Sequence, residues 1–242
     1  MSNILISGDS WSLGEIQMTK YSKKLDLWYD PRVMHRGINQ YFTDDHHTIT
    51  NVGIGGGNNA RTIESLKKAI NDDCDFIFFI QTDPFRELIP EIGVGYESNK
   101  IKDFYSSTPS KFLAKQQELL DIAYNKLNSL NKKIYCLGGT SKIDLPLISN
   151  YSNLIPLIPA ITELLCPDYQ HPELWVSAWR NQIANIQNKD LVELIMENFN
   201  RQKMLKDNYP HLFWPDGHHP NRHGHRIIYD YICRELHIGK GK

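Results

Sequence analysis

Residues 75–82, DFIFFIQT, are the part of the sequence that most narrows the possible folds. The run is almost wholly apolar until its end, which is typical of a central strand buried on both faces. A strand of this kind belongs to a parallel sheet covered by helices on both sides. The polar residues that follow, Gln81, Thr82 and Asp83, would then lie at the carboxyl edge of the sheet, where open α/β sheets bind ligands.

Strand and helix patterns alternate along the remaining chain, which predicts a mostly parallel sheet with helices on both faces. We interpret residues 1–242 as one domain. Residues 141–172 are rich in Pro, Leu and Ile and less regular, and we expect an ordered insertion there, a lid or a contact surface. Strands are predicted at 3–6, 47–54 and 133–137 with a short one near 164–166, and helices at 61–71, 110–130, 174–186, 190–205 and 221–236.

A turn that follows the first strand holds a candidate nucleophile. Gly8, Asp9 and Ser10 break the apolar run directly after it and place a serine hydroxyl at the carboxyl end of the strand. Such a serine becomes a nucleophile only if a base can reach it. The plain alternative is an ordinary turn, since Gly, Asp and Ser are all common turn residues.

A glycine run, GGGNNA at 55–60, lies between the second strand and the next helix. Backbone N–H groups in such a loop suit an anion or the oxyanion of an acyl-transfer reaction. The run lacks the Gly-Lys-Ser/Thr ending of a P-loop, and Asn58 breaks the G-x-G-x-x-G dinucleotide pattern. Phosphate binding is therefore the weaker interpretation of this loop.

The candidate base lies near the end of the sequence, in WPDGHHP at 214–220. Asp216 and His219 share a loop that prolines make rigid, so the carboxylate can orient the imidazole while its other nitrogen takes the serine proton. His218, His223 and His225 lie close by in sequence, and a metal site would be the alternative. We expect no metal, because the triad already uses His219.

The three motifs together resemble the SGNH (GDSL) hydrolase family: Gly8 to Ser12, Asn51 to Gly53 with its glycine run, and Asp216 to Pro220 occur in order. The resemblance covers 2–236 apart from 141–172. It implies a three-layer, flavodoxin-like α/β/α sandwich with a mostly parallel sheet of about five strands. It also implies ester or acyl hydrolysis without metal or cofactor, with Ser10 as nucleophile, Asp216 as orienting group and His219 as base.

The resemblance further implies an oxyanion hole built from the backbone N–H groups of Ser10 and Gly56. The family's third motif, Gly-x-Asn-Asp, supplies a side-chain amide, but here the equivalent stretch is QTDP, with Asp83 at the position of the Asn. An ionised carboxylate cannot donate a hydrogen bond. The hole therefore runs on backbone donors alone or takes an amide from Gln81, Asn58 or Asn59.

Charge and hydropathy exclude several kinds of partner. The formal net charge is −1, from 27 Lys and Arg against 28 Asp and Glu, and no basic stripe points to nucleic acid. There is no apolar stretch of membrane-spanning length and no signal-peptide pattern, so we expect a cytoplasmic protein without a membrane partner.

The main hypothesis is a serine esterase that works through an acyl-enzyme on a small-molecule or glycan ester, such as an O-acetyl group on a carbohydrate. Trp11, Asp9 and Trp214 are the residues expected to contact the substrate. One alternative is a non-catalytic, degenerate member that binds a glycan or a partner protein. A weaker alternative is a nucleotide or phosphate binder.

Overall fold

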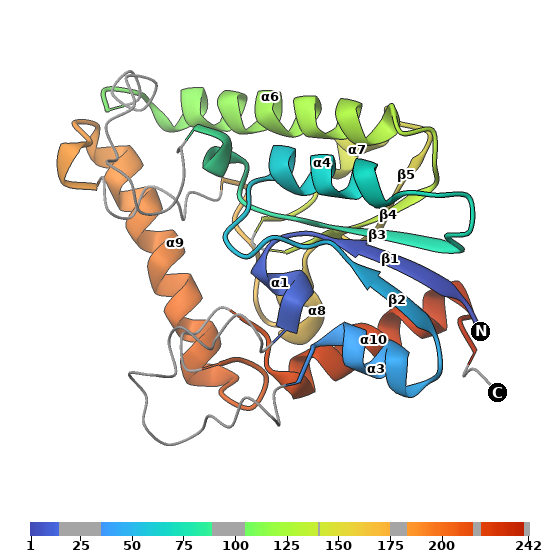
Figure 1. The fold of residues 1–242 in the computed structure, drawn as a ribbon. Coiled ribbons are helices and arrows are strands. Elements are labelled where there is room, and N and C mark those ends of the chain that lie inside the picture. Colours follow the sequence, from blue (N-terminus) through green and yellow to red (C-terminus); the bar gives the residue numbers. More distant parts are fainter. Residues whose placement is uncertain (15–34, 89–104, 140, 175–182, 215–218, 240–242) are drawn as a thin grey trace.

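Five parallel strands form the centre of the protein, in the order β2-β1-β3-β4-β5 (Figure 1). This is the order of the flavodoxin-like doubly wound sheet. The prediction of a flavodoxin-like, parallel sheet of about five strands is confirmed. The strands are β1 (Asn3–Ser7), β2 (Thr48–Asn51), β3 (Phe76–Gln81), β4 (Ile134–Gly138) and β5 (Leu154–Ile158).

Helices cover both faces of the sheet, so the protein has three layers (Figure 1). The computed structural model describes residues 1–14, 35–88, 105–139, 141–174, 183–214 and 219–239. One face carries α4 (Asn59–Ala69), α6 (Pro109–Asn128) and α7 (Leu145–Ile148). The other carries α3 (Ile38–Asp44), α8 (Ile161–Leu165) and α10 (Arg222–Leu236).

Alternate residues of the central strands divide the core between these two layers. Leu5 and Phe79 are buried in the cluster that includes α4 and α6, whereas Ile6 and Phe78 are buried in the one that includes α3 and α10. Successive side chains of a strand point to opposite faces, so the apolar run of β3 needs both helical layers. The interpretation of residues 75–82 as a strand buried on both sides is therefore correct.

The fifth strand does not lie near residues 164–166, where it was predicted. Residues 161–165 form α8, and β5 is instead LIPLI at 154–158. Pro156 lacks an N–H, but β5 is an edge strand of the sheet, where a missing donor is tolerated. Residues 141–172 thus contribute a strand and two short helices to the framework, and describing them as an irregular insertion was wrong.

Asparagine side chains set the starts of three of the helices. Asn58, Asn188 and Asn221 each accept a hydrogen bond from a backbone N–H in the first turn, of α4, α9 (Lys189–Asn208) and α10 respectively. Such caps satisfy N–H groups that the helix itself leaves without partners. The predicted helices at 61–71, 110–130, 190–205 and 221–236 are confirmed with small shifts at their ends, while the one at 174–186 falls largely outside the described residues.

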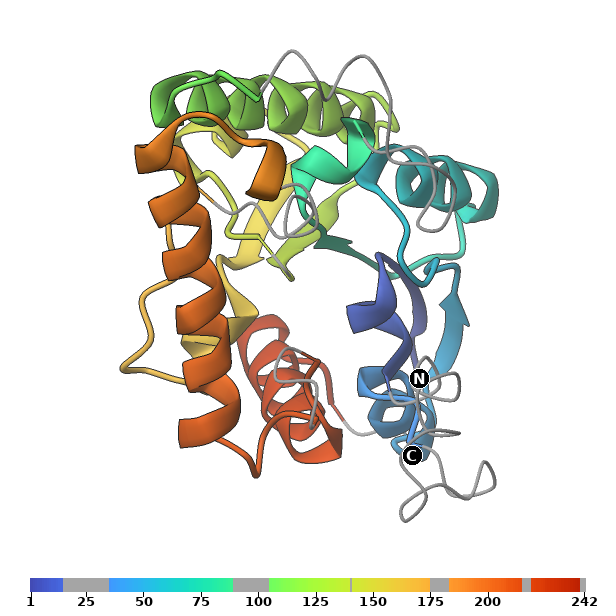
Figure 2. The same ribbon diagram turned by 90° about the vertical axis from the view of Figure 1, so that its left-hand side faces the viewer.

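Helix α9 stands at the end of the molecule where the strands finish, and it belongs to neither layer (Figures 1 and 2). Its Leu191 and Ile195 are buried with Phe85 and Phe112 in a separate apolar cluster. Phe85 belongs to a short 3₁₀ helix, η3 (Pro84–Leu88), directly after β3. The cluster therefore anchors α9 near the carboxyl edge of the sheet.

Within the described ranges, no helix has both the length and the apolar character needed to cross a membrane.

Candidate active site

Ser10 lies one turn beyond the carboxyl end of β1, as the first residue of α1 (Ser10–Leu13). The backbone at Gly8 passes close to β3, because a Cβ placed on it would come within 2.8 Å of the Ile80 Cβ. A side chain is therefore excluded at this position, and the chain can bend sharply after the strand. The Asp9 carboxylate caps α1 by accepting from the Trp11 N–H at 3.0 Å.

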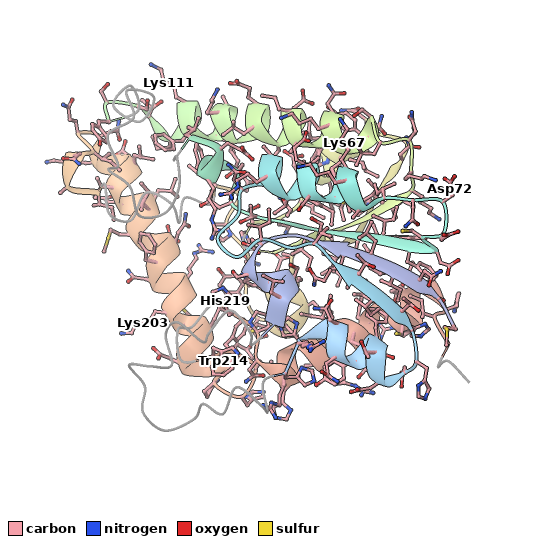
Figure 3. The ribbon with its side chains drawn as sticks, in the orientation of Figure 1. Lys67, Asp72, Lys111, Lys203, Trp214 and His219 are labelled. Carbon is pink, nitrogen blue, oxygen red and sulfur yellow. The ribbon has the colours of Figure 1, made fainter. Side chains whose placement is uncertain are left out.

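His219 meets Ser10, which lies 209 positions away in the sequence. The Ser10 Oγ and the His219 Nε2 are 2.6 Å apart. His219 lies beside α1 (Figure 3), and its carbonyl accepts a hydrogen bond from the Trp214 N–H at 2.9 Å. A hydroxyl within hydrogen-bond reach of an imidazole is the arrangement that activates a serine nucleophile. Asp216 lies outside the described residues, so its orienting role stays a prediction.

Asp9 and Trp11 are interior residues. Asp9 is 0% exposed, and its Oδ2 accepts from the Thr82 hydroxyl at 2.7 Å and from the Arg86 Nη1 at 3.1 Å. Trp11 is 2% exposed, with its ring 6.4 Å from that of His219. The expectation that these two side chains contact substrate does not fit their burial. Trp214, the third predicted contact, is half-buried.

The second motif surrounds the nucleophile turn from the side of β2. Asn51 donates to the Ser12 carbonyl at 2.7 Å and accepts from the Gly53 N–H at 2.8 Å. The Gly57 N–H donates to the Ile54 carbonyl at 2.8 Å, closing a turn in which Gly56 has φ of 68°. A positive φ at the third turn position favours glycine.

The turn at 54–57 uses one backbone N–H of the glycine run and leaves the predicted oxyanion donors without an internal partner among the described residues. The Gly57 N–H is used inside the turn and so is not a donor to a bound anion. Within the described part of the chain, no hydrogen bond engages the backbone N–H of Ser10 or of Gly56. The roles of these two N–H groups in an oxyanion hole stay predictions.

Two of the three amides proposed to replace the family Asn are committed to structural bonds. The Gln81 Nε2 donates to the Ser141 hydroxyl at 2.8 Å and to the Lys142 carbonyl at 2.9 Å. The Asn59 amide bonds both backbone groups of Thr82. Both N–H groups of the Gln81 amide are thus used, which argues against Gln81 as an oxyanion donor, while Asn59 uses one N–H and is 1% exposed.

Asn58 differs, because only its oxygen is used. Its Oδ1 accepts from the Arg61 N–H at 2.9 Å, while its Nδ2 donates to no other group in the described residues. Asp83 is 0% exposed and accepts from the Phe85 N–H at 2.9 Å, so it caps η3. Among the described residues, Asn58 is therefore the candidate amide whose two N–H groups both have no acceptor in the structure.

His225 on α10 is a buried neutral imidazole. It is 2% exposed, and burial, with smaller contributions from His35 and His219, lowers its pKa to about 3. A histidine with so low a pKa carries no charge near neutral pH and adds no positive charge beside His219. Across the described ranges, no three His, Cys, Asp or Glu side chains gather into a group that could hold a metal ion.

Three further residues, which no sequence motif indicated, hold these motifs together. Arg86 bonds Asp9, Glu87 accepts from the Ala60 N–H at 2.7 Å, and Asn39 donates to the Ser12 carbonyl at 2.8 Å. Burial raises the Glu87 pKa. The polar residues after β3 were a usable signal for Arg86 and Glu87, because they follow a buried strand at its ligand-binding edge.

Comparisons with known proteins find likeness in structure only. No family model matches the chain, and no curated protein matches it. Similar solved structures include the esterase EstA from Pseudoalteromonas sp., at 14% identity and a TM-score of 0.44, covering 98% of this chain and 97% of that one. The acetylxylan esterase Axe2 from Geobacillus stearothermophilus has 16% identity and a TM-score of 0.41, covering 100% and 96%.

A protein from Desulfitobacterium hafniense DCB-2, described as lipolytic and of the G-D-S-L family, has 9% identity and a TM-score of 0.46, covering 97% and 99%. Two of these three structures are thus described as esterases and the third as a lipolytic protein of the G-D-S-L family. At these identities and TM-scores the likeness carries no weight for function. The function proposed next rests on the contacts around Ser10.

Proposed function

We propose that the protein is a serine ester hydrolase that works through an acyl-enzyme. The observation that carries the proposal is the 2.6 Å contact between the Ser10 Oγ and the His219 Nε2 at the carboxyl edge of the sheet. His219 takes the hydroxyl proton as Ser10 attacks the ester carbonyl, and returns it to the leaving alcohol. Water, activated by the same imidazole, then releases the acid and frees Ser10.

The backbone N–H groups of Ser10 and Gly56 are the donors to the oxyanion in this mechanism, and the Asn58 Nδ2 joins them. No described group accepts from these three donors, whereas the Gln81 amide already donates twice and the Asn59 amide donates once and is buried. Asp216 orients His219. The acyl group is short, such as the acetyl of an O-acetylated carbohydrate, and no metal or cofactor takes part.

Reaction with a fluorophosphonate probe tests the nucleophile. We expect intact-mass analysis to show one adduct and peptide mapping to place it on Ser10, together with hydrolysis of p-nitrophenyl acetate faster than of the octanoate. A folded protein with neither adduct nor turnover would contradict the proposal and favour a non-catalytic binding protein. Equal rates for the two esters would contradict the short-acyl preference alone.

Replacement of Asn58 by Asp tests the third donor. Aspartate caps a helix as well as asparagine, so α4 should keep its start, but the carboxylate cannot donate. We expect kcat for p-nitrophenyl acetate to fall by about 10²–10³-fold, the usual cost of one oxyanion donor. Asn188→Asp is the matched control, because Asn188 caps α9 through the same kind of contact, at 3.0 Å to the Leu191 N–H.

The control variant should keep the wild-type kcat. If Asn58→Asp also stays within about threefold of wild type, the hole runs on backbone donors alone.

A further inference from the structure

The Arg86 guanidinium joins the two segments that carry the backbone oxyanion donors. Its Nη1 donates to the Asp9 Oδ2 at 3.1 Å and to the Gly57 carbonyl at 3.4 Å. Asp9 immediately precedes Ser10, and Gly57 immediately follows Gly56. One nitrogen atom therefore connects the residues next to both donors, although β1 and the glycine run are far apart in the sequence.

The contact between Arg86 and Asp9 also affects the charge around the oxyanion. Asp9 and Asp83 are both 0% exposed and both lie at the edge of the sheet where negative charge would develop on an oxyanion. In a site of low dielectric, a neighbouring uncompensated carboxylate opposes that charge strongly. Arg86 pairs with the Asp9 carboxylate, and its side chain is only 20% exposed, so water screens the pair incompletely.

Neighbouring contacts hold Arg86 and the glycine run in place. Glu87, the next residue in η3, accepts from the Ala60 N–H at the start of α4. The Thr82 backbone is bonded by the Asn59 amide at 3.0 and 3.3 Å. The segment after β3 is thus bound to the glycine run and α4 by several contacts, and two of its residues reach the nucleophile turn: Arg86, and Thr82 through its hydroxyl, which donates to the Asp9 Oδ2 at 2.7 Å.

We propose that Arg86 is a positioning residue of the oxyanion hole: its guanidinium sets the nucleophile turn against the glycine run and neutralises Asp9. This inference rests on the proposed function. Asp83 stands where the family has an Asn that donates to the oxyanion, so one donor is missing. Arg86 would compensate in part, because it aligns the two backbone donors and offsets the negative charge of Asp9, and both effects strengthen the stabilisation of the oxyanion. A misplacement of about 1 Å in such a site can cost 10²-fold in rate.

Arg86→Met tests the role, since methionine keeps an unbranched apolar stem without the charge or the donors. We expect kcat for p-nitrophenyl acetate to fall about 10²-fold while KM changes less than about threefold, because donor alignment matters most in the transition state. Arg86→Lys keeps the charge but not the planar fork, and should lose roughly tenfold. Because a smaller folded fraction would also lower kcat without changing KM, the rates are referred to the fraction of folded protein, measured by circular dichroism.

Arg201→Met is the matched control. Arg201 likewise joins a carboxylate to a carbonyl, with the Glu197 Oε1 at 2.6 Å and the Gln170 carbonyl at 3.1 Å, but on α9. Its kcat should equal that of the wild type. If Arg86→Met keeps kcat within about threefold of wild type, or if Arg201→Met loses as much as Arg86→Met, the proposal is wrong.

Amide hydrogen exchange supplies a readout that needs no turnover. The Ser12 N–H donates to the Asp9 carbonyl at 3.0 Å, and the Gly57 N–H closes the neighbouring turn. In Arg86→Met, and more weakly in Arg86→Lys, we expect both amides to exchange faster while those of α6 do not change.

The two proposals fail on different results. Absence of esterase activity in wild type would contradict the proposed function, whereas unchanged exchange at Ser12 and Gly57 would contradict the role of Arg86. If Arg86→Met does not fold, the kinetics and the amide exchange of Arg86→Lys test the role of Arg86 instead.

Discussion

Replacement of Ser10 by alanine is expected to lower kcat for p-nitrophenyl acetate by about 10⁴-fold or more, as loss of the nucleophile does in serine hydrolases. The hydroxyl is the only group at this position that can form the acyl-enzyme. The hydrogen bond that caps α1 comes from the Asp9 carboxylate, so the turn should survive the change. The measurement is the steady-state rate together with the thermal midpoint.

The control for Ser10→Ala is Ser110→Ala. Ser110 also lies in the first turn of a helix, α6, with an exposed hydroxyl that contacts the Thr108 hydroxyl at 2.9 Å. Its activity should equal that of wild type. If Ser10→Ala hydrolyses the ester at the wild-type rate and still accepts the fluorophosphonate probe, the nucleophile is another residue and the proposed function is wrong in its central part.

The fold could be predicted well where the sequence pattern is periodic and apolar. In the run at 75–82 and in the long helices, the spacing of apolar residues shows which side chains are buried. The sheet and the helical layers on its two faces can be predicted from that spacing. The fifth strand could not be predicted, because LIPLI at 154–158 is short and contains Pro156. A proline in a strand is acceptable only at an edge, and edge position is a property of the completed sheet.

Some residues of the candidate site could likewise be predicted from the sequence, and others could not. Ser10 and His219 were predicted from local motifs that occur near the two ends of the chain, and the structure brings them into contact. The uses of Gln81 and Asn59 could not be predicted, because their partners Ser141 and Thr82 become neighbours only when β3 and β4 pair and α4 packs on the sheet. Arg86 was missed for the same reason: its contacts join segments that are distant in sequence.

Replacement of His219 by glutamine is expected to lower kcat by about 10⁴-fold as well. Glutamine can hydrogen-bond to the Ser10 hydroxyl, but its amide cannot accept a proton near neutral pH. Because the imidazole serves both the attack and the release of the acid, the loss should appear in acylation and in deacylation. Stopped-flow measurement of the p-nitrophenol burst and of the later steady state separates the two steps.

His223→Gln is the control that distinguishes a base from a metal ligand. His223 lies four residues beyond His219, at the start of α10, and is exposed. A triad needs only His219, so this variant should keep the wild-type kcat, and added Zn²⁺ should not raise it. If instead both histidine variants lose activity together and the wild-type rate follows added Zn²⁺, the two side chains act as ligands. The contact between His219 and Ser10 would then orient the serine rather than deprotonate it.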